Sequence, residues 1–303
     1  MKFSSKNLFV LILLPLLILR RIYFWNKADK SKLPGIQFSE FGFNLGKNLL
    51  YKFKLSPRLL LNPVSIVRYF EFDFVNSSLR FGDEIRVLDV SSPYLFGFYV
   101  SSKYQLEYYY INPDERDLAN VNSLSAKMIF KGKYIPKPMD ALNLSFPDNY
   151  FDKIISISVI EHIRDDGDSN AVKEIWRALK TGGLFSFTVP VKKIFEIEYR
   201  NRDEYNLDKN EKANKYFFQR IYDSQKIEER LLSSISNYEI IQKKIFGAND
   251  REFYNAYKER WMKFNYWETV KDPYYISTKF SNFNEIDDLE DIGVIGLTIR
   301  KLK

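Results

Sequence analysis

From Arg86 onward, short apolar runs alternate with longer stretches in which apolar residues recur every three or four positions. This alternation predicts strands and helices that follow one another along the chain, as in an α/β domain built on a parallel sheet. One strand, between Met128 and Asp140, is expected to be short or at an edge, because Pro136 and Pro138 cannot donate ladder hydrogen bonds. The other expected strands are Arg86–Val90, Leu106–Ile111, Phe151–Ser158, Leu184–Val189, Tyr238–Phe246 and Val294–Arg300.

Helical periodicity is clearest in three segments. Ser169–Lys180 begins with a residue that can cap a helix and is followed by Thr181-Gly182-Gly183, where glycine allows a left-handed turn at the helix end. A second helix is expected at Ser224–Ser234. A third is expected to start at Asn62-Pro63 and to run to about Val75, with the proline at its first position.

The N-terminal segment contains a run of twelve apolar residues, LFVLILLPLLIL, at Leu8–Leu19. Lysines precede the run and two arginines follow it directly, whereas a membrane-spanning helix needs about 20 apolar residues. Basic flanks with Tyr23 and Trp25 at the edge are typical of a helix embedded in or lying on a membrane surface. Residues 1–30 are therefore expected to associate with a membrane. An uncleaved signal segment and a helix packed on the protein's own core are the alternatives.

The chain contains no cysteine and a single histidine, His162. Disulfides, thiolate metal sites and cysteine nucleophiles are thereby excluded, as are clusters of histidines around a metal. The net charge is +7, but residues 1–32 hold seven basic residues against one acidic residue, and the remainder holds 39 against 38. The basic surface of a nucleic-acid-binding domain is missing from the body of the chain, so neither nucleic acid nor a metal is expected as a partner.

Four segments, in order, indicate a ligand site at the ends of strands. The first is a buried strand that ends near Asp89 and leads through a loop into a helix, whose N-terminal amides can receive an anionic group. In an open α/β sheet, ligands bind beyond the carboxyl ends of the strands, where the strand order reverses. The segments are IRVLDVSSPYLFG at 85–97, YYYINPDERD at 108–117, MDALNLSFPDNYFDKIISISVIEHI at 139–163 and EIWRALKTGGLFSFTVP at 174–190.

The pattern D-A-x-x-L-x-F-P-D-x-x-F-D, followed by a strand, V-I-E-H-I and R-A-L-K-x-G-G, resembles the class I S-adenosylmethionine (SAM)-dependent methyltransferases of type 11. The resemblance covers about a third of the chain, from residue 85 to residue 190. It implies SAM as cofactor and an α/β fold with a Rossmann-like, mostly parallel seven-stranded sheet and helices on both faces, here preceded by an N-terminal helical extension. The expected organisation is a hydrophobic, basic segment at 1–30, a helical lead-in at 31–80 and a methyltransferase domain at 81–303, with insertions at about 192–222 and 250–290.

The resemblance also implies which residues would surround the cofactor. The methionine moiety would lie beside Asp89 and the loop after it, the ribose beside Asn112, and the adenine edge beside Asp140. Residues at the end of the fourth strand would close the pocket. The implied contacts are Asp89, Ser91, Ser92, Pro93, Asn112, Asp140, Ala141, Val159 and Ile160.

Two positions depart from the usual pattern of this family. The loop after the first strand is commonly G-x-G-x-G, whereas Ser91, Pro93 and Leu95 occupy the glycine positions here. Glycine permits positive φ angles and a close approach of the backbone to a ligand, while serine offers a hydroxyl group instead. Asn112 stands where the family usually has an acid, so it retains hydrogen bonding but lacks the charge.

The expected reaction is direct SN2 transfer of the SAM methyl group to an unidentified small-molecule, lipid or sugar-type acceptor. The protein then mainly aligns the two reactants and excludes water. A general base is needed only if the acceptor must lose a proton, and the candidates are His162, Glu161 and Tyr222. The insertion at 192–222 is expected to border the acceptor, because it is too long for a tight connection.

A non-catalytic Rossmann-like binding module at a membrane is the alternative interpretation, and the loop without glycines favours it. A nicotinamide-dependent enzyme is disfavoured because G-x-G-x-x-G is absent. The expected location is the cytoplasmic side of a membrane, with the protein peripheral or anchored through residues 1–30, or otherwise the cytoplasm.

Overall fold

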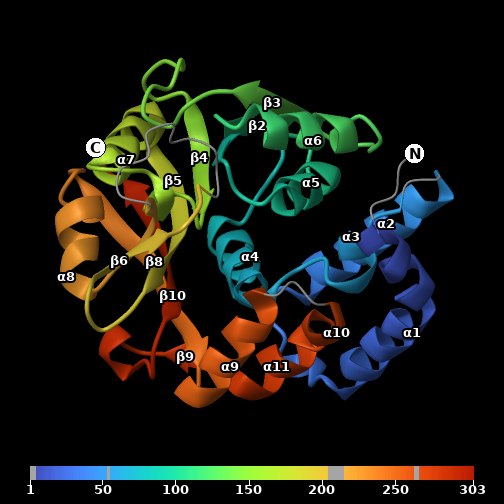
Figure 1. Cartoon of the computed structure of the whole chain (residues 1–303). Helices are drawn as coiled ribbons and strands as arrows, with labels where there is room; N and C mark the ends of the chain where they lie inside the picture. The colour runs from blue at the N-terminus through green and yellow to red at the C-terminus, as the bar shows by residue number, and fades with distance from the viewer. Residues whose placement is uncertain (1–4, 53–54, 204–214, 263–265) are drawn as a thin grey trace. The chain divides into compact units, whose positions relative to one another are not determined.

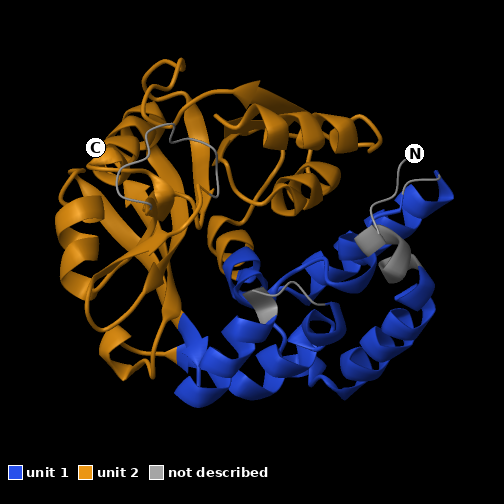
Figure 2. Cartoon of the chain, viewed as in Figure 1, with its two compact units in different colours: residues 1–73, 246–282 blue, residues 74–245, 283–303 orange. Residues whose placement is uncertain are grey.

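The computed structural model describes residues 5–52, 55–203, 215–262 and 266–303. The chain forms two compact units, coloured separately in Figure 2. Residues 1–73 and 246–282 make up the first, here called the helical unit, and residues 74–245 and 283–303 make up the second, the sheet unit. The chain crosses between the units inside helix α4 and strands β8 and β9.

The central sheet has eight strands in the order β3-β2-β1-β4-β5-β10-β8-β9. The pairs β2–β3, β1–β2, β1–β4 and β4–β5 are parallel, while β10 runs antiparallel to β5. The predicted mostly parallel sheet is therefore confirmed, with the short β9 as an additional edge strand. The strands are β1 (Arg86–Val90), β2 (Glu107–Asn112), β3 (Lys133–Pro138), β4 (Phe151–Ile157), β5 (Leu179–Val191), β8 (Tyr238–Ala248), β9 (Phe280–Phe283) and β10 (Gly293–Lys301).

Helices flank this sheet (Figure 1). They pack on strands whose side chains are buried almost without interruption, such as β1 and β4, because a parallel sheet with covered faces has little contact with water. A separate antiparallel hairpin, β6 (Glu196–Arg200) and β7 (Tyr216–Ile221), follows β5. The helical elements of this unit are α5 (Tyr94–Lys103), α6 (Glu115–Ser125), η2 (Ile160–His162), α7 (Gly167–Ala178), α8 (Ser224–Ile227), the π-helical turn η3 (Glu228–Leu232) and η4 (Ile286–Asp288).

The helix expected at Ser169–Lys180 is present as α7, but both of its predicted ends are wrong. The helix starts at Gly167 after Asp166, so Ser169 lies inside the first turn, where its hydroxyl donates to the Arg230 carbonyl at 2.6 Å. It ends at Ala178, and β5 begins at the next residue. Gly182 does adopt a left-handed φ of 81°, but within β5, where the pairing with β4 skips several residues. The glycine therefore shapes a bulge in the strand.

The helical unit contains α1 (Ser5–Lys27), η1 (Lys30–Lys32), α2 (Ile36–Tyr51), α3 (Pro57–Leu61), α9 (Arg251–Met262), α10 (Tyr266–Thr269) and α11 (Asp272–Lys279). Helix α4 spans Ile66–Leu79, so the helix expected to start at Asn62-Pro63 begins later. Asn62 instead ends α3, and its side-chain amide donates to Asp272 at 3.0 Å. The proline at a first helical position is Pro57 of α3.

One face of α1 packs against its own unit. Leu17 is buried in a small apolar cluster with Leu61 of α3 and Val270, which follows α10. None of the described helices is both long enough and apolar enough to cross a membrane. Residues 250–290, expected as an insertion of the methyltransferase domain, mostly form α9 to α11 and are grouped with the first 73 residues.

Candidate functional site

The strand order reverses direction at β1. From β1 the chain continues to β2 and β3 on one side of it, and then to β4 and β5 on the other. The order β3-β2-β1-β4-β5 is that of doubly wound nucleotide-binding folds, in which a ligand binds at the carboxyl ends of the strands beside this switch point. A ligand is therefore expected to bind beside the residues that follow β1 and β4.

Asp89, near the end of β1, is fully buried and organises the loop that follows it. Its Oδ1 accepts the backbone N–H of Ser92 at 3.0 Å, and its Oδ2 accepts the Tyr108 hydroxyl at 2.6 Å. Burial raises the pKa of Asp89 to about 6, although both hydrogen bonds favour the charged carboxylate and oppose that rise. The carboxylate thus holds the loop in one conformation through groups of the protein itself.

The two serines after Val90 connect three strands. Ser91 has a left-handed φ of 55°, and both its N–H and its hydroxyl donate to the Ile111 carbonyl of β2, at 2.9 and 2.8 Å. Ser92 is buried, and its hydroxyl accepts the N–H of Ile157 in β4 at 3.0 Å. Ser158, directly after β4, also has a positive φ of 48°. Such backbone conformations in non-glycine residues cluster at functional sites.

Helix α5 begins immediately after this loop, with Pro93 at its N-cap position. Its packing on the sheet depends on Gly97, because a Cβ atom there would lie 2.7 Å from Cε1 of Tyr108. A glycine at this place lets a helix approach the strand closely, as in dinucleotide-binding turns. The first turn of α5 therefore lies just beyond the end of β1. Its free amide groups can bind an anionic group there.

Asn112 lies at the end of β2 as predicted, but its amide group serves the following turn. Its Nδ2 donates to Asp117 at 2.8 Å and to the Tyr110 hydroxyl at 3.1 Å, and its Oδ1 accepts the N–H of Asp114 at 2.8 Å. Asp114 in turn caps α6 by accepting the Arg116 N–H at 2.9 Å. The role of Asp114 and Asp117 was not predicted, although PDERD at residues 113–117 is typical of a helix start.

The residues expected near the adenine edge and the fourth strand differ in exposure. Asp140 follows β3 and is exposed, with one carboxylate oxygen accepting the Leu142 N–H at 2.9 Å. Ala141 is buried in the core, and so is Ile160. Val159 is half-buried and packs against the same core. Of these four, Asp140 is the only one with a polar side chain at the end of its strand.

Glu161 and His162 lie in the short helix η2 after β4. Glu161 is buried, and its Oε1 lies 3.7 Å from Nε2 of His162. Nδ1 of His162 lies 2.7 Å from the Phe218 carbonyl of β7, and the two rings make an edge contact with centroids 4.9 Å apart. A carbonyl oxygen can only accept, so Nδ1 carries the proton and Nε2 is the basic nitrogen of the neutral ring.

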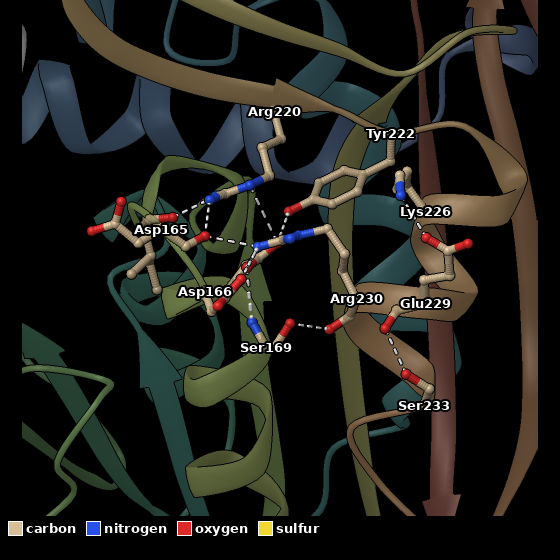
Figure 3. Close-up of polar contacts among 11 residues, drawn as sticks. Asp165, Asp166, Ser169, Arg220, Tyr222, Lys226, Glu229, Arg230 and Ser233 are labelled. Carbon is tan, nitrogen blue, oxygen red and sulfur yellow. Dashed lines mark hydrogen bonds and ion pairs between the residues drawn. The ribbon is translucent and has the colours of Figure 1, made fainter.

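Tyr222 belongs to a buried cluster centred on Asp168, here called the Asp168 cluster and made of Asp168, Arg220, Tyr222 and Arg230. The Tyr222 hydroxyl donates to Asp168 Oδ2 at 2.9 Å, and Arg230 makes two bonds to the same carboxylate, at 2.7 and 2.8 Å. Burial, together with Asp168, raises the pKa of Tyr222 well above its usual value. Figure 3 shows Arg220, Tyr222 and Arg230 gathered around the start of α7, near Asp165, Asp166 and Ser169.

Arg220 binds that loop directly. Its two terminal nitrogens donate to the carbonyls of Ile163 and Asp165, and its Nε lies 3.5 Å from Asp168. Arg220 is almost fully buried. Of the insertion expected to border the acceptor, residues 204–214 lie outside the described residues, and the rest forms the β6–β7 hairpin and its flanks.

A cavity of about 530 Å³ lies at the opposite ends of the strands. Its walls include the first residues of β1 and β2, and they carry both cations and acids. Several of these charges pair with one another, as Lys133 does with Glu107 at 2.9 Å and Lys180 with Asp152 at 2.6 Å. The switch point, with its ordered loop, is therefore the better candidate for a cofactor site.

Part of the sheet unit matches a known protein family. Residues 95–187 match the family model described as a methyltransferase domain, a match that begins just after the loop in which serine and proline replace glycines. No curated protein matches the chain. Solved structures with a similar fold include the MccD protein, with 13% identity, a TM-score of 0.51 and coverage of 78% of this chain and 99% of that one.

Two further solved structures resemble the chain less closely in shape. The YcgJ protein from Bacillus subtilis has 16% identity and a TM-score of 0.49 over 77% of this chain and 99% of its own. Phosphoethanolamine N-methyltransferase 2 of Haemonchus contortus, solved with S-adenosyl-L-methionine, has 15% identity and a TM-score of 0.47, over 77% of this chain and 52% of its own. Residues 95–187 of the sheet unit thus match a methyltransferase domain, and its strand order is that of a Rossmann-like nucleotide-binding fold.

Proposed function

We propose that the sheet unit binds SAM at the carboxyl ends of β1, β2 and β3 and transfers its methyl group to a small-molecule, lipid or sugar-type acceptor. The observation that carries this proposal is the loop after β1, which is ordered by the buried Asp89 and contains a non-glycine residue, Ser91, at a φ of 55°. A strained loop that is held at the switch point by hydrogen bonds supports a preformed ligand site there.

The residues present fit an elongated nucleoside-containing cofactor. Ser91, Asn112 and Asp140 follow three adjacent strands, and neighbouring strands lie about 4.8 Å apart, so their polar groups are spread over about 10 Å. The first turn of α5 provides amides for an anionic group at one end of this row. The exposed carboxylate of Asp140 provides a hydrogen-bond acceptor at the other end.

When bound, SAM supplies an already activated methyl group, so the reaction is an SN2 displacement at that carbon. The protein's contribution is to hold the two reactants in line and to exclude water. Among the three base candidates, His162 is the best placed, since Nε2 is its basic nitrogen and Nδ1 is fixed by the Phe218 carbonyl. Tyr222 donates its hydroxyl proton to Asp168, so its proposed role is to position the loop before α7.

Isothermal titration with SAM and with S-adenosylhomocysteine tests the binding site. Asp89→Ala removes both acceptors that order the loop and is expected to weaken SAM binding at least about tenfold, or about 1.4 kcal/mol. Asp89→Asn keeps an acceptor for the Ser92 N–H and is expected to restore most of the affinity. Asp287→Ala, at an exposed acid of the same unit, is the control.

The outcomes separate the two candidate functions. Unchanged affinity in Asp89→Ala, with native circular dichroism, would remove the β1 loop from the site. If the native protein bound neither compound, the non-catalytic binding module would be favoured. The observation that supports this alternative is that the Ser92 hydroxyl is already engaged with the N–H of Ile157 in β4.

A further inference from the structure

Helix α1 has an apolar face that its own unit leaves uncovered. The exposed fractions are 69% for Ile12, 49% for Leu16, 65% for Leu19 and 53% for Tyr23. Their spacing of four, three and four residues places them on one side of a helix with 3.6 residues per turn. Four large apolar side chains in a row are more than the scattered exposed residues of an ordinary surface.

The opposite face of the same helix holds α1 in place. Leu17 is 4% exposed and packs on Leu61 and Val270. Arg21 is also buried, and its guanidinium lies over the ring of Phe43 at 4.3 Å. The helix is therefore anchored by its inner face, and the four side chains of its outer stripe are each 49% exposed or more.

Positive charge follows the stripe along the chain. Lys27, one turn beyond Tyr23, is exposed, and its ammonium lies 5.0 Å from the Tyr23 ring. Lys32, in η1, is exposed over 69% of its side chain, and its ammonium lies 3.9 Å from the exposed Asp29 carboxylate. Residues 1–32 contain seven basic residues and one acidic residue. An apolar stripe that ends in an aromatic residue and lysines matches the boundary between acyl chains and anionic headgroups in a lipid bilayer. A neutral protein surface, by contrast, would offer no partner for the positive charge.

We propose that α1 docks the helical unit on an anionic lipid surface. The helix lies in the plane of the surface, with Ile12, Leu16, Leu19 and Tyr23 in the acyl boundary and Lys27 and Lys32 among the lipid phosphates. Its other face stays on the protein, so binding requires neither a spanning segment nor refolding of the unit. This surface is independent of the proposed SAM site, and its test needs no methyl acceptor.

Vesicle co-sedimentation of the whole protein tests the proposal. The vesicles consist either of phosphatidylcholine alone or of phosphatidylcholine with phosphatidylglycerol. The native protein is expected to bind the anionic vesicles more strongly, and added salt is expected to weaken that preference because it screens the lysines. The double variant Leu16→Glu, Leu19→Glu is expected to lower the partition coefficient at least about tenfold on both vesicles.

Two further variants distinguish the parts of the surface. Ile129→Glu introduces one glutamate at an apolar residue of the sheet unit that is 94% exposed, and this variant is expected to bind as the native protein does. Lys27→Glu with Lys32→Glu is expected to abolish the preference for anionic vesicles while leaving weak binding to the neutral ones. Thermal melts verify that each variant is folded.

Equal partition of native protein and the Leu16→Glu, Leu19→Glu variant would overturn the proposal. It would also be overturned if the native protein bound no vesicles but formed a dimer in sedimentation experiments that the same variant dissociated. In that case the stripe would be covered by a second copy of the chain.

Discussion

Ser91 combines a backbone angle that favours glycine with a hydroxyl hydrogen bond that glycine cannot make. Its φ of 55° costs about 1 kcal/mol or more in a residue with a Cβ atom. Its hydroxyl bond to the Ile111 carbonyl returns a similar amount, about 1 kcal/mol. The departure from the glycine-rich pattern therefore preserves the shape of the loop by a different means.

Substitution of Ser91 tests this balance. Ser91→Gly relieves the strain and loses the hydroxyl bond, so the free energy of unfolding is expected to change by less than about 1 kcal/mol and SAM affinity by less than about threefold. Ser91→Val places a β-branched side chain at a positive φ and is expected to cost more than about 2 kcal/mol. Urea unfolding and titration calorimetry measure both effects. Native-like stability of the valine variant would contradict the assigned strain.

At this scale the sequence predicted where the site residues lie but not what their side chains bind. Asp89 and Asn112 were both expected at strand ends, and both are there. That Asp89 accepts the Tyr108 hydroxyl depends on the register in which β1 pairs with β2, which places Leu88 opposite Tyr109. Register is set by packing of the whole sheet, so no local sequence pattern predicts that Tyr108 is the partner of Asp89.

The Asp168 cluster ties together elements that are far apart along the chain. Asp168 is in α7, Tyr222 follows β7, and Arg230 is in the π-helical turn after α8. The sequence predicted one continuous helix over Ser224–Ser234, whereas the structure has four α-helical residues and then this turn. In that turn the Arg230 side chain makes its two bonds to Asp168, more than 60 residues earlier.

Tyr222→Phe tests whether this residue acts through structure or through chemistry. Loss of the bond to the Asp168 carboxylate is expected to lower the free energy of unfolding by about 2 kcal/mol, while SAM affinity stays within about threefold. Tyr199→Phe, at an exposed tyrosine of β6, is the control and is expected to change neither. If Tyr222→Phe abolished methyl transfer with native stability and SAM affinity, the tyrosine would be a catalytic residue after all.

Each unit of the molecule contains a fully buried aspartate. In the helical unit, Asp272 accepts the Tyr257 hydroxyl at 2.6 Å and the Asn62 amide at 3.0 Å, and burial raises its pKa from 3.8 to about 7. In the sheet unit, burial raises the pKa of Asp89 to about 6. A raised pKa means that the folded state keeps its proton at pH values where the unfolded chain has lost it.

The sign of the pH effect follows from this difference. Between about pH 4 and pH 7 only the folded state holds the proton on Asp272, so its stabilising contribution is complete below pH 4 and is lost as the pH rises through 7. Asp272→Asn cannot titrate. The native melting temperature is therefore expected to exceed that of Asp272→Asn by more at pH 5 than at pH 8, as measured by thermal scans. Asp287→Asn, at an exposed acid, is the control, and a constant difference would contradict the assignment.

No local sequence pattern predicted that the chain would form two units, each built from segments that are far apart in the sequence. The helices after residue 250 were expected as an insertion of the methyltransferase domain, and the structure groups most of them with the first 73 residues. What unites them is packing, such as that of Leu17 with Val270, and hydrogen bonding, such as that of Asn62 with Asp272. Contacts over more than 200 positions leave no periodicity that a sequence pattern can reveal.

This discontinuity sets the order in which the chain can fold as it leaves the ribosome. The helical unit lacks α9 to α11 until residue 282 has been made. The sheet unit lacks β10, the antiparallel partner of β5, until Lys301 has emerged. Neither unit can complete its core during most of translation, and the nascent chain carries exposed apolar strands and helices that chaperones would have to protect.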